Sequence, residues 1–269
     1  MNNKLLISSI FIVIVGLFLA YNCITYRSPS HKELPRLDHQ IKHLALIMDG
    51  NRRWAHKQGF KPWIGHKKGV DPLKASLEFC LEQNIPYLSV YAFSLENFKR
   101  SAEELSYLFD VLAQELAATE FENLLKHNIK VVFVGDRTQF PQQLVSIIND
   151  IERKSAQNTR LVLNILFCYG GQQEIVQATQ KIAQLVQEKK LTPDQITSEL
   201  FESYLWSAGT PPPDLIIRTA GDHRLSNLFC YQSAYSELYF INCYWPDITK
   251  QHLYDIIKDF IQTKRRFGA

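Results

Sequence analysis

Residues 43–53 read HLALIMDGNRR, an apolar run that ends abruptly in an acid, a glycine, an amide and two arginines. The run predicts a buried strand over Leu44–Met48, with Asp49 at its carboxyl end and Gly50 in a tight turn. The next residues then open a helix, whose free N–H groups bind anions. An aspartate is a hard oxygen ligand for Mg²⁺, and the arginines are cationic donors. The stretch therefore suggests a magnesium–diphosphate site; the alternative is a structural turn with Asp49 as N-cap.

Beyond this stretch, apolar runs rich in β-branched and aromatic residues alternate with longer segments of helical spacing. The strand-like runs are His43–Met48, Tyr87–Phe93, Lys130–Gly135, Leu161–Phe167, Asp214–Arg218 and Glu237–Phe240. The helical segments are residues 66–84, 101–127, 139–157, 171–189, 193–206 and 250–266. Strands that alternate with helices predict an α/β fold, in which helices cover both faces of a parallel sheet. We therefore expect a single domain with a central, mostly parallel six-stranded sheet.

The N-terminal 26 residues differ in composition from the rest of the chain. Leu5–Tyr21 carries no charge and is apolar apart from a Ser-Ser pair, which predicts a transmembrane helix within residues 1–26. A cleaved signal peptide is the main alternative. Positive charges concentrate on the downstream flank, which favours a single-pass anchor with the body of the protein in the cytoplasm. Residues 27–42 are polar, contain two prolines and are expected to be a linker to one domain over residues 43–269.

The overall composition excludes several other classes of protein. A formal net charge of +3 is too small to indicate nucleic acid binding, so local arginine clusters must account for any anion site. The five cysteines form no CxxC pair and are odd in number. This pattern favours reduced, packed thiols over a disulfide framework or a zinc site.

Two further polar clusters follow predicted strands. YAFSLENFKR, Tyr91–Arg100, offers a hydroxyl, a carboxylate, an amide and a guanidinium, whereas DLIIRTAGDHRLSN, Asp214–Asn227, places two arginines and a serine around a glycine turn. Ligands of such sheets bind beyond the carboxyl ends of the strands, so we expect both clusters to converge with Asp49. The alternative is that they are helix caps and solvated loops. Glu237 could be a second metal ligand or a structural carboxylate.

Together these segments resemble the cis-prenyltransferase family, and within it the undecaprenyl diphosphate synthases, or isoprenyl transferases. The matching stretches are HLALIMDGNRRWA, GHKKGV, YAFSLENFKR, LVLNILFCYGG, DLIIRTAGDHRLSN, AYSELYF and YWPDI. They occur in order between residue 43 and the C-terminal RRFG, so the resemblance covers nearly everything after the predicted linker. It implies that residues 43–269 form a cis-prenyltransferase catalytic domain.

The resemblance implies an Mg²⁺-dependent enzyme that condenses an allylic diphosphate, usually farnesyl diphosphate, with successive isopentenyl diphosphates. The product would be a polyprenyl diphosphate lipid carrier such as undecaprenyl diphosphate. A hydrophobic tunnel, a homodimer and the absence of DDxxD motifs are also implied, and the sequence contains no DDxxD. A membrane-anchored, partner-dependent or non-catalytic subunit and a shorter-chain cis-prenyl synthase remain alternatives. A nucleotide-binding enzyme is not indicated, because GxxxxGK[ST] and GxGxxG are absent.

The same resemblance implies roles for individual residues. Asp49 would be the essential acid that engages Mg²⁺, with Glu237 completing the metal site. Asn97 would assist proton removal from isopentenyl diphosphate, although an amide is a poor base and more plausibly positions a water or a phosphate oxygen. The residues implied to contact the allylic diphosphate or line the site are Gly50, Asn51, Arg52, Arg53, Trp54, His66, Ser94, Leu95, Glu96, Phe98 and Arg100. Those implied to bind isopentenyl diphosphate are Arg218, Arg224, Leu225 and Ser226.

Two positions depart from the family pattern. Pro62 stands four residues before His66, where many members carry arginine, and the neighbouring Lys61 supplies charge without a bidentate fork. Leu166 and Phe167 replace the usual alanines before the Tyr-Gly-Gly motif. If either side chain points into the tunnel the product would be shorter. We favour the other orientation, in which both are core residues.

Overall fold

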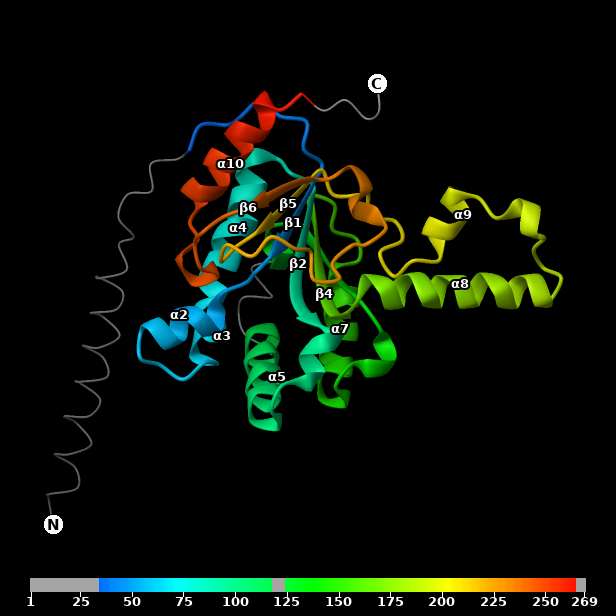
Figure 1. Cartoon of the computed structure of the whole chain (residues 1–269), viewed down its shortest axis with the longest axis horizontal. Helices are drawn as coiled ribbons and strands as arrows, with labels where there is room; N and C mark the ends of the chain where they lie inside the picture. Colours follow the sequence, from blue (N-terminus) through cyan, green and yellow to red (C-terminus); the bar gives the residue numbers. More distant parts are fainter. Residues whose placement is uncertain (1–33, 118–123, 265–269) are drawn as a thin grey trace, which may run out of the picture. The chain divides into compact units, whose positions relative to one another are not determined.

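Six parallel strands form one sheet in the order β3-β4-β2-β1-β5-β6 (Figure 1). The computed structural model describes residues 34–117 and 124–264. The strands are β1 (His43–Ile47), β2 (Tyr87–Ser94), β3 (Ile129–Val134), β4 (Leu161–Tyr169), β5 (Leu215–Arg218) and β6 (Glu237–Phe240). The predicted sheet is confirmed, and each strand ends within two residues of its expected limits.

The helices agree with their predicted positions, with two differences. They are α2 (Asn51–Lys57), α3 (Ile64–Lys68), α4 (Val70–Gln83), α5 (Ala102–Ala117), α7 (Gln142–Ser155), α8 (Gly171–Gln187), α9 (Ser198–Ser203) and α10 (Lys250–Gln262). The segment expected as one helix over residues 66–84 divides at Gly69 into α3 and α4. The segment expected over residues 193–206 contains only a 3₁₀ turn and α9.

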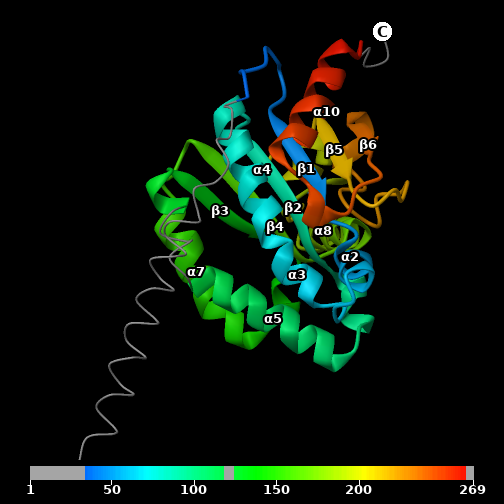
Figure 2. The ribbon, with the colours of Figure 1, turned by 90° about the vertical axis from the view of Figure 1, so that its left-hand side faces the viewer.

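The sheet has helices on both faces, which explains its composition. α10, α4, α5 and α7 lie over one face (Figure 2), whereas α8 lies on the other and extends beyond the sheet together with α9 (Figure 1). β1 is buried at every residue. Strands covered on both sides should be continuously apolar, as β1 is after His43. β6 is at the edge of the sheet, and its four residues are half-buried or exposed.

The chain crosses from one half of the sheet to the other beside β1. After β1 it builds β2, β3 and β4 on one side, and it then returns to place β5 on the other side of β1. The carboxyl ends of β1, β2 and β5 therefore border a topological switch point, the usual ligand-binding position in such sheets.

Leu166 and Phe167 point to opposite faces of β4, and both are core residues. Leu166 is 0% exposed and belongs to an apolar cluster with Ile47, Tyr169 and Phe229. Phe167 is 1% exposed and packs on the other face, in an aromatic cluster whose members are Phe93, Phe109, Phe133 and Phe140. Both residues are buried and line neither cavity at Asp49, as expected of core residues, but Phe167 lies on the face of the sheet that α5 covers.

The described part of the chain contains no helix that is long and apolar enough to cross a membrane. The predicted anchor, residues 1–26, lies outside the described residues, as do residues 27–33 of the predicted linker, whereas residues 34–42 are described and contain no helix or strand. Residues 36–269 belong to one compact unit, in which the four described cysteines are free thiols.

Candidate active site

Gly50 makes the turn from β1 into α2 and thereby places Asp49 at the carboxyl edge of the sheet. Its φ is 101°, in the left-handed region that favours glycine. A Cβ at this position would lie 2.8 Å from Tyr244 Cδ1 and 2.9 Å from Ala220 Cβ, so a larger residue does not fit. The Asp49 carbonyl accepts a hydrogen bond from Thr219 Oγ1 at 2.6 Å, which fixes the backbone against the end of β5.

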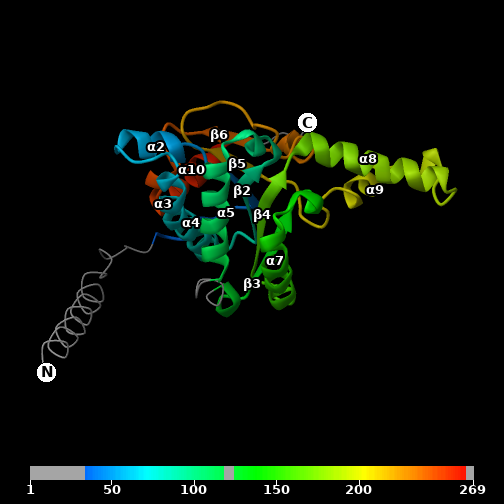
Figure 3. The same cartoon turned by 90° about the horizontal axis from the view of Figure 1, so that it is seen from below.

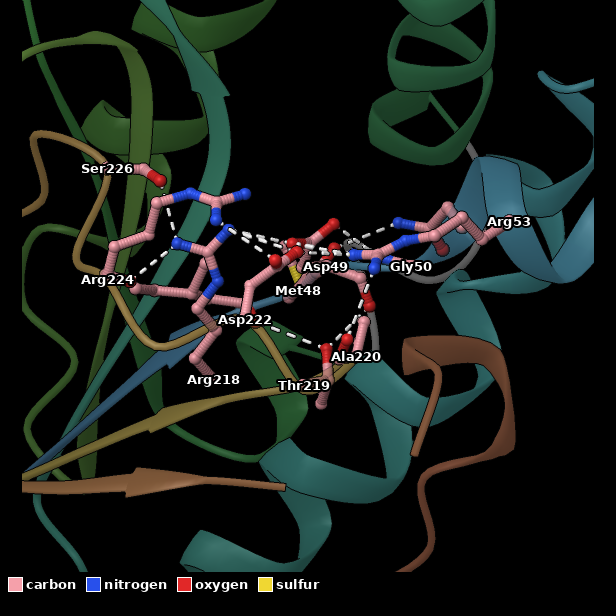
Figure 4. A network of polar contacts seen from close by, with 12 residues as sticks. Met48, Asp49, Gly50, Arg53, Arg218, Thr219, Ala220, Asp222, Arg224 and Ser226 are labelled. Carbon is pink, nitrogen blue, oxygen red and sulfur yellow. Dashed lines mark hydrogen bonds and ion pairs between the residues drawn. The ribbon is translucent and has the colours of Figure 1, made fainter. Parts of the chain in front are cut away.

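The Asp49 carboxylate joins two arginines that come from different parts of the chain (Figure 4). Its Oδ2 accepts from Arg218 Nη2 at 2.8 Å and pairs with Arg53 Nη2 at 3.1 Å. Its Oδ1 accepts from Gly50 N at 2.6 Å. The N-cap of α2 is Gly50, so the alternative role of Asp49 as the N-cap is wrong. Asp49 instead gathers two guanidinium groups at the switch point.

Asp222 extends this network and was missed by the sequence analysis. It accepts from Arg53 Nη2 at 2.8 Å and from Arg224 Nη1 at 3.0 Å. Burial lowers the pKa of Arg53, but the charges of Asp49 and Asp222 outweigh it, so that the pKa is raised overall. The position of Asp222 just before Arg224, within the glycine turn, is the signal that could have identified it.

Arg218 is the buried cation of the site, with a side chain that is only 5% exposed. Besides Asp49, its guanidinium donates to Ser226 Oγ at 2.7 Å and to the Arg224 carbonyl at 2.5 Å. These bonds fold the loop after β5 back over the end of the strand. Arg218, Arg224 and Ser226 therefore lie together, as the sequence analysis expected, and Arg224 stays 60% exposed at the rim.

The loop after β2 closes the opposite side of the site. Ser94 and Asn97 cap the 3₁₀ helix η1 (Leu95–Lys99) reciprocally, and Ser94 N donates to Asn97 Oδ1 at 3.1 Å. The amide oxygen is thus engaged within the protein. This geometry favours the positioning role of Asn97 over direct proton abstraction.

Glu104, in the first turn of α5, lies beside the basic side chains on this side of the site. The sequence analysis did not identify it. The residue is 5% exposed, and it accepts from Arg100 Nη1 at 3.2 Å. Its Oε1 also lies 3.8 Å from Arg52 Nε and 3.8 Å from His66 Nε2. The four-residue spacing from Arg100 is the sequence signal for this pair.

His66 is held neutral beside these charges. α3 carries it against the start of α2, where a Cβ on Gly65 would lie 2.0 Å from Asn51 O. Burial lowers the pKa of His66 to about 3, and the positive charges of Arg100 and Arg52 act in the same direction. Its buried Nε2 has no hydrogen-bond partner among the described residues. Such a nitrogen is free to meet a bound ligand.

Two cavities meet at Asp49. The first is about 440 Å³, and one of its walls is apolar, formed by Ile47, Val70, Leu73, Leu108, Leu112 and Trp245. The polar groups on its other side include Ser94, Asn97, Arg218 and Ser226. The second, about 550 Å³, is polar and is lined by residues that include Gly50, Arg52, Arg53, His56, Pro62 and Asp222. Both are lined by Asp49, Asn51, His66, Arg100 and Arg224. The site thus offers two cationic surfaces for anions and an apolar wall for a lipid.

Five predicted substrate contacts do not lie on either cavity wall: Trp54, Leu95, Glu96, Phe98 and Leu225. Several of them support the site instead. Trp54 Nε1 donates to Asp247 Oδ1 at 2.8 Å, Phe98 packs edge-on against Phe93, and Glu96 accepts from Asn227 Nδ2 at 2.8 Å. These residues surround the two cavities without lining them, and their direct substrate contacts stay predictions.

Glu237, the predicted second metal ligand, begins β6, whereas Asp49 follows the carboxyl end of β1; its metal role stays a prediction. Glu237 is the first residue of β6 and is in register with Leu215, whereas Asp49 lies two residues beyond Ile47, the partner of Arg218. No cluster of three potential metal-ligating side chains occurs among the described residues.

Comparison with known proteins agrees with this geometry. The family model described as "Putative undecaprenyl diphosphate synthase" matches residues 47–268. The chain belongs to this prenyltransferase family. The prenyltransferase is 43% identical to the isoprenyl transferase of Heliobacterium mobile, over 86% of this chain and 89% of the relative. It is 40% identical to the farnesyl-diphosphate-specific ditrans,polycis-undecaprenyl-diphosphate synthase of Escherichia coli K12, over 90% and 94% of the two chains.

Solved structures share the fold of the prenyltransferase. Lavandulyl diphosphate synthase from Lavandula x intermedia, in complex with dimethylallyl diphosphate, superposes with a TM-score of 0.82 at 33% identity, over 85% of this chain and 98% of that one. A probable undecaprenyl diphosphate synthase from Campylobacter jejuni gives 0.71 at 31% identity, over 86% and 100%. The names of these two structures state different products, lavandulyl diphosphate and undecaprenyl diphosphate.

Proposed function

We propose that this prenyltransferase catalyses cis-prenyl chain elongation. It condenses an allylic diphosphate, with farnesyl diphosphate as the first choice, with successive isopentenyl diphosphates to make a polyprenyl diphosphate lipid carrier such as undecaprenyl diphosphate. One observation carries the proposal: two cationic surfaces meet at Asp49, and an apolar wall between α4 and α5 continues from the same point. Two diphosphates and one growing hydrocarbon chain require this combination.

The allylic diphosphate would bind in the polar cavity beside the start of α2. Breaking its carbon–oxygen bond leaves negative charge on the departing diphosphate. Arg52 and Arg53 line this cavity at the start of α2, and together with the first N–H groups of that helix they would stabilise the charge. Neutral His66 can offer a hydrogen bond without adding to the positive charge.

Isopentenyl diphosphate would bind on the other side of Asp49. Arg218 and Arg224 supply the cationic donors for its diphosphate, and Ser226 supplies a hydroxyl. Its terminal alkene carbon then faces the allylic carbon, the new carbon–carbon bond forms between them, and a proton leaves the isopentenyl unit. Asn97 would orient the acceptor of that proton, and the lengthened chain would extend along Leu108 and Leu112.

We also propose that Mg²⁺ is the cofactor and that Asp49 holds it. Mg²⁺ characteristically binds one or two carboxylates together with substrate phosphates, which suits a single aspartate between two anion sites. When bound, the ion neutralises charge on the leaving diphosphate. The residues of the chain bind and orient the two substrates.

The quaternary arrangement and location are proposals of the same kind. A homodimer is supported by the edge strand β6, where Leu238 is 42% exposed and the preceding Tyr235 is 66% exposed. A single-pass anchor with a cytoplasmic catalytic domain is supported by the uncharged Leu5–Tyr21 and its positive downstream flank. Light scattering of purified protein and carbonate extraction of membranes test the two proposals separately.

Product analysis tests the function. The full chain would be incubated with farnesyl diphosphate, labelled isopentenyl diphosphate and Mg²⁺ in detergent, and the extracted chains sized. Long cis-polyprenyl products are expected. Short products would support the shorter-chain alternative. No incorporation by folded protein, with several allylic primers, would overturn the proposal and favour a partner-dependent subunit.

A further inference from the structure

The hairpin formed by α2, α3 and the loop between them carries positive charge and exposed apolar side chains. Residues 50–70 contain six lysines and arginines and no acid; the basic residues are Arg52, Arg53, Lys57, Lys61, Lys67 and Lys68. The hairpin projects from the rest of the domain (Figure 3). At its outer end Phe60 is 52% exposed, and Ile64 is 37% exposed.

The contacts separate the inward-facing from the outward-facing cations of this hairpin. Arg52 and Arg53 lie near Glu104 and Asp49, on the wall of the polar cavity. The outer lysines differ: Lys57, Lys61 and Lys67 are exposed and form no ion pair with any residue that the structure describes. The active site therefore does not account for these three charges.

Aromatic residues alternate with the outer lysines. Lys61 Nζ lies 5.0 Å from the centre of the Trp63 ring, which is a cation–π contact. The ring of Phe60 packs against that of Trp54, with 6.3 Å between the two ring centroids. Neither Phe60 nor Lys61 lines the two cavities at Asp49. Aromatic rings at the depth of lipid headgroups, together with lysines beside them, are typical of surfaces that rest on anionic bilayers.

We propose that this hairpin is a docking surface for an anionic lipid bilayer, formed by Phe60, Ile64, Lys57, Lys61 and Lys67. The lysines complement lipid phosphates, and the two apolar side chains enter the headgroup boundary. Docking would bring the mouth of the polar cavity, lined by Pro62 and His56, next to the membrane. This goes beyond the proposed function and is distinct from the predicted N-terminal anchor, because it fixes the orientation of the catalytic domain.

Hydrogen–deuterium exchange of the full chain in lipid nanodiscs tests the proposal. Nanodiscs of phosphatidylcholine with phosphatidylglycerol would be compared with nanodiscs of phosphatidylcholine alone, so that any anchor is embedded in both. Slower exchange over residues 56–68 is expected only with phosphatidylglycerol, and added salt should reverse it. Equal exchange in the two lipids, or protection confined to another surface, would overturn the proposal.

Matched charge reversals separate docking from catalysis. Lys57→Glu with Lys67→Glu should abolish the lipid-dependent protection, whereas Lys126→Glu with Lys181→Glu, at exposed positions elsewhere, should retain it. Elongation in detergent should be unchanged in both double variants. Hydrogen–deuterium exchange is measured without substrate. A protein that is inactive in elongation but still shows the lipid-dependent protection would therefore refute the proposed function and support the docking surface. Protection that survives the first pair of reversals would refute the docking surface alone.

Discussion

A single carboxylate, Asp49, organises the site at the scale of individual residues. Arg53 and Arg218 both contact its Oδ2, although one follows β1 and the other ends β5. Charge-assisted hydrogen bonds of this kind contribute roughly 1.5–3 kcal/mol each, so removing the charge should also loosen both arginines. Asp49 was predictable because it ends an apolar strand before a glycine. Asp222 and Glu104 were not, since a carboxylate in a loop or first helical turn has many ordinary roles.

Asp49→Asn should reduce elongation by about 10²–10³-fold, the range found when one preorganised electrostatic contact in an active site is lost. The amide keeps the size of the side chain but removes the charge that the arginines share. Initial rates of isopentenyl incorporation measure the effect. Asp247→Asn, which alters a carboxylate bonded to Trp54 away from the cavity walls, is the control and should stay near wild type. Comparable rates in the two variants would contradict the role of Asp49.

The assignment of two diphosphate sites predicts two separate effects on KM. Arg52→Gln removes a cation that lines only the polar cavity and should raise KM for the allylic substrate about tenfold. Ser226→Ala removes a hydroxyl that lines only the other cavity and should raise KM for isopentenyl diphosphate about two- to tenfold. Each variant should leave the other KM nearly unchanged. The assignment would fail if both variants affected the same substrate.

At the scale of elements, hydrophobic pattern predicted the strands well and some helices poorly. β1 and β4 are apolar apart from His43 and Asn164 because both faces are covered, and this pattern is visible in the sequence. The break between α3 and α4 at Gly69 was not predicted, although Gly69 and Pro72, in the first turn of α4, are both signals of a helix boundary. The position of Glu237 relative to Asp49 was not predictable, since it depends on the register between β5 and β6.

The packing of β4 and α5 predicts which residues control product length. Phe167→Ala empties a site surrounded by aromatic rings and should cost about 3–5 kcal/mol of unfolding free energy. It should not change product length, because Phe167 lies outside the cavity walls. Leu112→Trp, on the apolar wall, should shorten the products instead. Urea unfolding and chain sizing measure the two effects; longer products from Phe167→Ala would show that this side chain limits the tunnel.

At the scale of the whole molecule, topology brings the three polar clusters together. β2 and β5 flank β1, so the loops that follow these three strands meet at one edge although they are far apart in sequence. The alternation of strands and helices made this convergence predictable. The shape of the resulting cavities was not predictable, because it depends on side chains from α3, α4 and α5 that periodicity alone assigns to the core.

Buried histidines should make the domain sensitive to acid. His43 is 0% exposed, its Nε2 lies 2.7 Å from Ser89 Oγ, and burial lowers its pKa from 6.5 to about 4. Between those values the unfolded chain binds a proton that the native state does not bind. The stability contributed by neutral His43 is therefore complete above pH 6.5 and falls as the pH drops toward 4, by about 3 kcal/mol in all.

The free energy of unfolding, measured in urea at several values between pH 7 and pH 5, checks this expectation. His43→Asn should be less stable at neutral pH, because it loses packing, but its stability should fall less steeply as the pH is lowered. Buried His66, whose lowered pKa acts in the same direction, accounts for part of the slope that remains. His127→Asn, at an exposed position, should keep the wild-type slope. Equal slopes in wild type and His43→Asn would mean that His43 takes up its proton equally in the folded and unfolded states, which its burial between β1 and β2 argues against.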